Sequence, residues 1–240
     1  MTSQEVIKQL KLKANPKNVA GMVRFGISSK NTLGVSMPQV REIGKEIKRS
    51  FGRLGRPQDD KTLHKLALSL WESEIHEARI LAGLFDLPKM ITEKQADEWV
   101  KGFDSWDVCD QVCMNLFDKT SFAFKKAIEW SEKKEEFVRR AGFALMASLA
   151  VHDKKAKNLD FIAFLPIIKK QATDERNFVK KAVNWALRQI GKRNLALNKE
   201  ALKTAKEIEK IDSKAAKWIA HDAIRELTSE AVLARLKVNN

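Results

Sequence analysis

The sequence predicts an all-α protein, and three observations support this prediction. Apolar residues recur at intervals of three and four positions through nearly all of the 240 residues, which is the spacing of an amphipathic helix. Glycine and proline are sparse, with 10 and 5 residues respectively, so there are few positions at which a helix must break. No segment between those breaks shows the strict alternation that is typical of a β-strand.

The breaks between the predicted helices lie at recognisable turn signals. The dipeptide Asn15-Pro16 ends the first helix, because a proline cannot continue one. Ser36 is expected to cap a helix that has Pro38 in its first turn and runs to Arg49. Further breaks are expected in a loop from Gly52 to Asp60, at Leu87-Pro88, and in a polar connector from Lys154 to Asn158.

The second half of the chain contains an internal repeat. The segment Phe137-Val138-Arg139-Arg140-Ala141 is echoed by Phe178-Val179-Lys180-Lys181-Ala182, so that the two alanines lie 41 residues apart. A fainter echo follows at Ala223-Ile224. A period near 40 with two helices per unit is typical of HEAT and armadillo repeats. We therefore expect one domain, residues 1–240, in which HEAT-like helix pairs stack into a curved superhelix with the basic pairs along one face.

The charge is strongly positive and unevenly distributed. The chain has 45 Lys and Arg against 31 Asp and Glu, a formal net charge of +14. Residues 1–120 carry 19 basic and 16 acidic groups, while residues 121–240 carry 26 and 15. A basic excess confined to one half favours a polyanionic partner such as nucleic acid over a merely lysine-rich surface.

Several classes of protein are disfavoured. The N-terminus lacks the pattern of a signal peptide, and the longest apolar run, Phe161 to Ile168, is too short to span a membrane. Cys109 and Cys113 are the only cysteines, so we expect buried, reduced thiols in a cytoplasmic protein, associated with the nucleoid when bound to DNA. The four histidines do not pair with these cysteines at zinc spacing, and no Walker motif or Gly-x-Ser-x-Gly elbow is present. We therefore expect neither a metal nor a cofactor.

The segment from Phe103 to Cys113 is the most unusual in the chain. Ser105 can cap a helix in which Trp106 and Asp110, four positions apart, share a face. Asp107 lies about 100° around that helix from Trp106, and we interpret it as a structural residue or a helix-start charge.

Taken together, several motifs resemble the AlkD-type DNA alkylation repair family. They are Ser-Trp-Asp-x-x-Asp at 105–110, Val-Arg-Arg-Ala at 138–141, Phe-Val-x-Lys-Ala-x-x-Trp-x-Leu-Arg at 178–188, Gly-Val-x-x-Pro-x-x-Arg at 34–41, and the segment Trp71-Glu72 to Glu77-Ala78-Arg79. The resemblance covers essentially the whole chain. It implies a HEAT-like fold and a glycosylase that releases 3-methyladenine and 7-methylguanine from duplex DNA as part of base excision repair.

The resemblance also implies a set of site residues. Asp110 would be the catalytic aspartate, Trp106 and Trp185 the tryptophans that face the sugar, and Arg140 the supporting arginine. A cationic alkylpurine leaves as a neutral base and needs little acid catalysis. A carboxylate and two indole faces would stabilise the oxocarbenium-like sugar, and the carboxylate would position a water. We expect no tight pocket for the base.

Each of these residues also has an ordinary structural interpretation. Asp110 could be a paired surface carboxylate, Trp106 and Trp185 could belong to the core, and Arg140 could be a surface cation; their joint occurrence favours the functional interpretation. The remaining tryptophans, Trp71, Trp99, Trp130 and Trp218, are assigned to packing between helices. The candidates for contact with DNA phosphates are Arg139, Lys180, Lys181, Arg188, Lys192 and Arg193.

The sequence is compatible with three functions. The first is a monomeric, cofactor-free glycosylase, a hydrolase acting on cationic alkylpurines in double-stranded DNA. The second is a non-catalytic HEAT-like protein that binds distorted or branched DNA, and the third is a protein-interaction solenoid. A carboxylate facing a phosphate backbone would not help pure DNA binding, which favours the first. The strongly basic second half disfavours the third.

Overall fold

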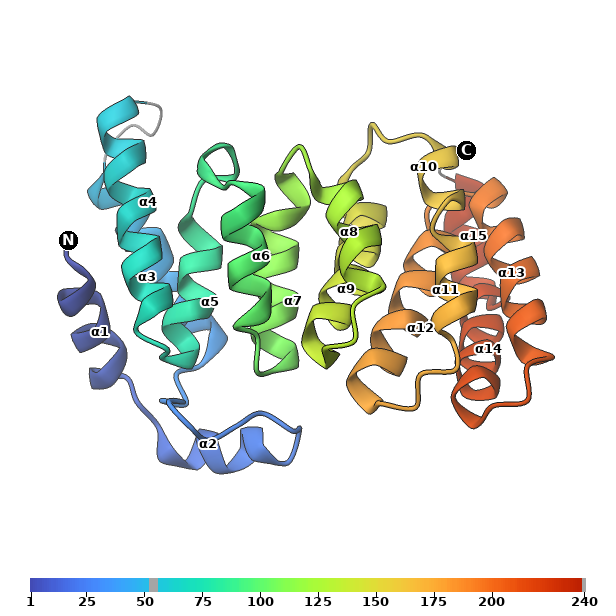
Figure 1. Ribbon diagram of the computed structural model, residues 1–240, viewed down its shortest axis with the longest axis horizontal. Coiled ribbons are helices and arrows are strands. Elements are labelled where there is room, and N and C mark those ends of the chain that lie inside the picture. Colours follow the sequence, from blue (N-terminus) through green and yellow to red (C-terminus); the bar gives the residue numbers. More distant parts are fainter. Residues whose placement is uncertain (52–55, 239–240) are drawn as a thin grey trace. The chain divides into compact units, whose positions relative to one another are not determined.

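The computed structural model describes residues 1–51 and 56–238, and every regular element in these residues is a helix. The chain divides into two compact units, Met1–Thr120 and Ser121–Asn240 (Figure 1). The predicted all-helical fold is confirmed for the described residues. The prediction of one domain over residues 1–240 stays a prediction.

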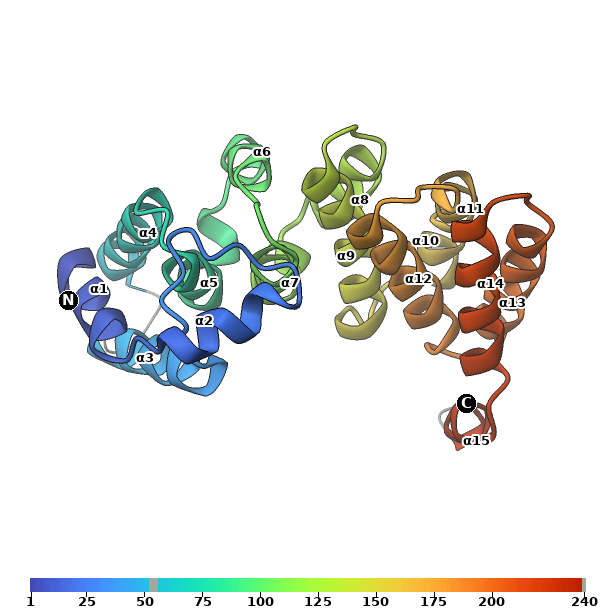
Figure 2. The same cartoon turned by 90° about the horizontal axis from the view of Figure 1, so that it is seen from below.

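The first unit is built from paired helices that surround α5. Its helices are α1 (Ser3–Leu12), α2 (Pro16–Val23), α3 (Met37–Ser50), α4 (Pro57–Glu72), α5 (His76–Phe85), α6 (Glu93–Lys101) and α7 (Trp106–Asn115), with 3-10 turns η1 (Pro88–Met90) and η2 (Phe117–Lys119). Helix α5 packs against α3, α4 and α7. Helix α2 differs from its neighbours because it lies across the ends of α5 and α7 (Figures 1 and 2) and none of its residues is buried.

Most of the predicted breaks in this unit are confirmed. Asn15 caps α2, and Pro16 is its first residue, where the missing N–H of proline costs nothing. Ser36 occupies the N-cap of α3, and Gln39 Oε1 accepts from both its backbone N–H and its hydroxyl. The expected loop from Gly52 is wrong at its end, because Pro57 already begins α4. Residues 52–55 of that loop lie outside the described residues.

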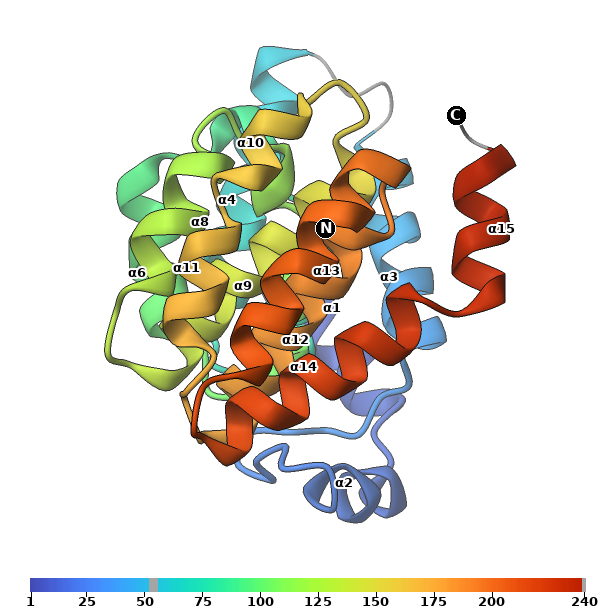
Figure 3. The same ribbon diagram turned by 90° about the vertical axis from the view of Figure 1, so that its right-hand side faces the viewer.

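The second unit consists of stacked helix pairs. Its helices are α8 (Ala123–Ser131), α9 (Glu136–His152), α10 (Asn158–Ile162), α11 (Leu165–Gln171), α12 (Asn177–Gly191), α13 (Leu195–Glu209), α14 (Lys214–Leu227) and α15 (Glu230–Val238). Helices α9, α12 and α14 form one layer, with α8, α11 and α13 packed behind them (Figures 1 and 3). Helix α15 stands at the edge of this unit and packs on α13 and α14 (Figure 3).

The internal repeat corresponds to this stacking. Phe137 is the second residue of α9 and Phe178 the second residue of α12, and their ring centroids lie 5.5 Å apart. Hydrogen bonds also join residues that lie 38 positions apart in the chain. Arg140 Nη1 donates to the Phe178 carbonyl at 2.6 Å, and Asn184 Nδ2 donates to Asp222 Oδ2 at 2.7 Å. A separation of 38 is three residues, about one helical turn, short of the 41-residue period. Each helix therefore contacts the turn that precedes its own equivalent in the next repeat.

Helices α8 and α9 pack with their backbones in close contact. A Cβ added at Gly142 of α9 would lie 2.3 Å from the Ser131 backbone nitrogen at the end of α8. No side chain fits at that distance, so the approach of the two helices depends on glycine at position 142.

Candidate active site and nucleic-acid interface

The start of helix α7 is held by a buried network of polar side chains. Ser105 at its N-cap is fully buried, and the Ser105 hydroxyl donates to Asp107 Oδ1 at 2.7 Å. The other carboxylate oxygen, Oδ2, lies 2.8 Å from His76 Nε2 on α5. Asp107 therefore ties α7 to α5, in agreement with its interpretation as a structural residue.

The two partners of this pair have shifted pKa values. Burial alone would raise the pKa of Asp107, but the hydrogen bond and charge of His76, with the bonds from Ser105 and the Val108 backbone, outweigh it and lower the pKa. Burial alone would lower the pKa of His76, but the hydrogen bond to Asp107 and nearby carboxylate charges raise it. Both shifts favour an imidazolium–carboxylate ion pair.

Trp106 and Asp110 both lie on α7, as the sequence predicted. Trp106 is half-buried, and its indole Nε1 donates to the Phe25 carbonyl at 3.0 Å. This bond fixes the orientation of the indole from the loop that follows α2. Asp110 follows one turn later and is also half-buried, and the four-residue spacing places it on the same helix face as Trp106.

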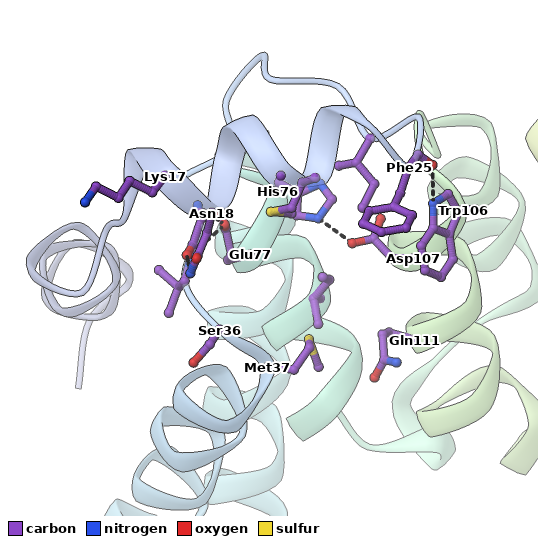
Figure 4. Close-up of a pocket in the computed structure, with 16 residues that line it drawn as sticks. Lys17, Asn18, Phe25, Ser36, Met37, His76, Glu77, Trp106, Asp107 and Gln111 are labelled. Carbon is purple, nitrogen blue, oxygen red and sulfur yellow. Dashed lines mark hydrogen bonds and ion pairs between the residues drawn. The ribbon is translucent and has the colours of Figure 1, made fainter.

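A cavity of about 460 Å³ lies beside this helix, within the first unit. Figure 4 shows α2 passing over it, with Trp106, Asp107 and Gln111 reaching it from α7 and His76 from α5. Asp110 does not belong to the described residues that line it. The sequence had predicted no tight pocket for a base, so a cavity with Trp106 in its wall was not anticipated.

The wall opposite α7 is the loop before α3, and the backbone of this loop is hydrogen-bonded to a buried carboxylate. Glu77 is 1% exposed, and its oxygens accept the backbone N–H groups of Leu33, Gly34 and Val35 at 2.6 to 3.1 Å. Gly34 has φ +76°, and a Cβ there would lie 2.2 Å from the Asn15 carbonyl oxygen. The motifs at Gly34 and Glu77 therefore shape the cavity wall through backbone geometry.

The other two predicted site residues lie in the second unit. Arg140 on α9 is 6% exposed, and its Nη1 donates to the Phe178 carbonyl. Trp185 on α12 is half-buried rather than a fully buried core residue. The predicted set of Asp110, Trp106, Arg140 and Trp185 is thus divided between the two units.

The cations predicted to contact phosphates differ in their surroundings. Lys181 is exposed, and the Lys180 ammonium lies 5.2 Å from the Trp218 ring centroid. The others have partners within the unit. Arg139 pairs with Asp174, Arg188 and Lys192 pair with Glu226, and Arg193 donates to the Ala150 and Ala156 carbonyls. A phosphate would have to compete with these partners at Arg139, Arg188 and Lys192.

The packing role assigned to the remaining tryptophans is confirmed for three of them. Trp71, Trp99 and Trp130 are buried, and the first two rings stack at 4.2 Å. For Trp218 the assignment is wrong, because its side chain is 40% exposed. It lies in the second turn of α14, and its ring lies beside the Lys180 ammonium of α12. The exposed part of this ring is accessible to a partner.

Sequence reasoning also missed a basic surface in the first unit. Between Glu5 and Glu42 the chain contains seven cations and no carboxylate, namely Lys8, Lys11, Lys13, Lys17, Arg24, Lys30 and Arg41, and all seven are exposed. The charge count by halves concealed this run, because residues 42–120 carry an excess of carboxylates that lowers the net charge of the first half to +3. A count over shorter windows would have found it.

Comparison with known proteins places the chain in a family. The family model described as DNA alkylation repair enzyme matches residues 6–227. The chain belongs to that family. No curated protein matches the sequence.

A solved structure resembles the repair-family chain over almost its whole length. It has a TM-score of 0.74 and 19% sequence identity, and the match covers 98% of this chain and 96% of the other. That protein is described as one of a new family related to the HEAT-like repeat DNA glycosylases, with affinity for branched DNA structures. The likeness confirms the predicted helical solenoid of HEAT-like repeats.

Among residues 1–51 and 56–238, no group of three or more His, Cys, Asp or Glu could hold a metal ion. In the same ranges, no helix is long and apolar enough to cross a membrane. Cys109 and Cys113 are buried thiols that form no disulfide, and burial raises the pKa of Cys113 well above its usual value.

Proposed function

We propose that this member of the DNA alkylation repair family hydrolyses the N-glycosidic bond of cationic alkylated purines in duplex DNA. The observation that carries the proposal is the arrangement on α7. There a half-buried carboxylate, Asp110, follows one turn after an indole, Trp106, whose orientation is held by the Phe25 carbonyl.

The chemistry of the substrate suits these groups. A purine alkylated at N3 or N7 carries a positive charge and departs as a neutral base, so the enzyme need not supply a proton. The sugar becomes positively charged in the transition state, and the Asp110 carboxylate would stabilise that charge and orient the attacking water. An indole face adds a cation–π attraction of about 0.5–2 kcal/mol.

The residues of the second unit complete the proposal. Trp185, half-buried on α12, would offer the second indole face. Arg140 already donates to the Phe178 carbonyl and is almost fully buried. We therefore propose that Arg140 acts by holding the start of α12 in place.

The test is base release from methylated duplex DNA. We expect the purified protein to liberate 7-methylguanine and 3-methyladenine while leaving uracil and hypoxanthine in place, because the proposed site supplies no acid for a neutral base. Asp110→Asn should abolish release with little change in folding or DNA affinity, since the amide is nearly isosteric. Excision of uracil would contradict the proposed mechanism.

Asp104→Asn serves as the matched control for this variant. Asp104 is an exposed carboxylate just before α7, so its loss removes the same charge without touching the proposed site. Asp107→Asn should also retain most activity at temperatures where it stays folded. Equal loss of activity in Asp104→Asn and Asp110→Asn would refute a specific role for Asp110.

A second candidate is non-catalytic binding of branched DNA. It is favoured by the similar solved protein, which is described as having such affinity. If it holds, the chain should bind a three-way junction more tightly than a duplex of equal length and should release no methylpurine.

A further inference from the structure

A second cavity, of about 440 Å³, lies within the second unit and has a basic lining. Its volume falls within the range of about 300–1,000 Å³ that is typical of small-molecule sites. Four of the described residues that line it are cations, namely Lys154, Lys192, Arg193 and Arg235, and none is a carboxylate or an aromatic residue. The cavity therefore suits an anion better than a flat apolar ligand.

The four cations come from three different helix ends. Lys192 is the C-cap of α12 and Arg193 follows it, while Lys154 lies just after α9 and Arg235 lies in the last turn of α15. Cations are generally favoured near helix C-termini, because the last carbonyl groups are exposed there. That preference explains each cation on its own helix, but it does not require three helices to direct their cations into one cavity.

The two arginines are held in place by backbone carbonyls. Arg193 Nη1 and Nη2 donate to the Ala150 and Ala156 carbonyls at 3.0 and 3.1 Å, and Arg235 Nη2 donates to the Lys192 carbonyl at 3.3 Å. These bonds orient the guanidinium groups without neutralising them, because a carbonyl carries no net charge. A guanidinium has five N–H donors, so further donors remain for a ligand.

Most of the positive charge in the cavity is not balanced by a carboxylate. Lys192 pairs with Glu226. In the described part of the chain, the other three cations of the cavity form no salt bridge. Burial lowers the pKa of Arg193, although the charge of nearby Asp153 acts in the opposite direction. An anionic ligand would therefore supply the compensating charge that this cavity lacks.

We propose that this cavity binds an anion with more than one phosphate group, held by Lys154, Arg193 and Arg235. One phosphate carries at most about two negative charges near neutral pH, fewer than these three cations. Neither Arg140 nor Trp185 belongs to the described residues that line the cavity. The inference thus goes beyond the proposed glycosylase reaction. Two sources present such phosphates, a free diphosphate and the backbone of a DNA strand.

A pair of double variants tests the cavity. Lys154→Gln with Arg235→Gln removes two of the cations that line it. Lys155→Gln with Lys237→Gln is the matched control, because these two lysines are neighbours on the same connector and the same helix and do not line the cavity. All four side chains are exposed, so both double variants should fold, which circular dichroism verifies.

Binding of inorganic pyrophosphate to the full chain is measured by isothermal titration calorimetry at constant ionic strength. We expect saturable binding to the wild type and to the control. The cavity variant should bind at least about tenfold more weakly, because hydrogen bonds to charged groups are among the stronger ones in proteins. Either of two results would overturn the proposal: no saturable binding to the wild type, or equal weakening in the two double variants.

The source of the phosphates is decided with unmethylated duplex DNA. Lys192 and Arg193 are also among the predicted DNA contacts, so a DNA strand is one of the two sources. If DNA supplies the phosphates, the slope of log K against log salt should be shallower by about 1.8 in the cavity variant than in the control, about 0.9 for each lost contact. Equal slopes, with pyrophosphate binding lost only in the cavity variant, assign the site to a free diphosphate. The glycosylase proposal is decided separately, by base release from methylated DNA.

Discussion

Replacing Asp107 with asparagine should destabilise the protein in a manner that depends on pH. The His76–Asp107 pair joins α5 to α7, with side-chain exposures of 4% and 18%. Asparagine keeps the shape and one hydrogen bond but removes the charge. Because hydrogen bonds to charged groups contribute about 1.5–3 kcal/mol, we expect a loss of about 2 kcal/mol in the free energy of unfolding near pH 5.5.

The direction of the pH dependence follows from the two pKa shifts. The lowered pKa of Asp107 contributes stability that is present above about pH 4 and lost as the pH falls through its folded value. The raised pKa of His76 contributes stability that is present below about pH 6.5 and lost as the pH rises through its folded value. Asp107→Asn should therefore cost most between about pH 4 and 6.5 and less than half as much at pH 8.5.

Urea unfolding followed by far-ultraviolet circular dichroism at pH 5.5 and 8.5 measures both effects. In a His76→Gln background the Asp107→Asn substitution should lose its pH dependence, since the titrating partner is gone. If Asp107→Asn destabilised the protein equally at the two pH values, the ion pair would not be the source of the stability.

Two further substitutions test the backbone geometry and the DNA interface. Gly34→Ala should lower the free energy of unfolding by about 3 kcal/mol in urea melts, because alanine would need a positive φ and its Cβ would meet the Asn15 carbonyl oxygen at 2.2 Å; a stability within 0.5 kcal/mol of the wild type would contradict this. Lys181→Ala should reduce the slope of log K against log salt by about 0.9 for duplex DNA, since Lys181 is exposed; an unchanged slope would place the phosphate contacts elsewhere.

The sequence by itself determined the fold class and the repeat. The 3.6-residue periodicity, the scarcity of breaking residues and the spacing of Ala141 and Ala182 are local signals, and local hydrogen bonding is what forms a helix. The position of Trp106 and Asp110 on one helix could be predicted for the same reason.

Only the tertiary structure decided which side chains face solvent and which residues meet across elements. Trp218 was predicted to pack between helices, but its side chain is 40% exposed and meets the Lys180 ammonium of α12. His76 and Asp107 lie 31 residues apart in the chain and meet because α5 packs on α7. Glu77 likewise reaches the loop at Gly34 across 43 residues. Such partners depend on how apolar faces pack, and a helix's own sequence does not specify the face that its neighbour presents. The cavity beneath α2 arises in the same way, from a helix that covers its neighbours without being buried by them.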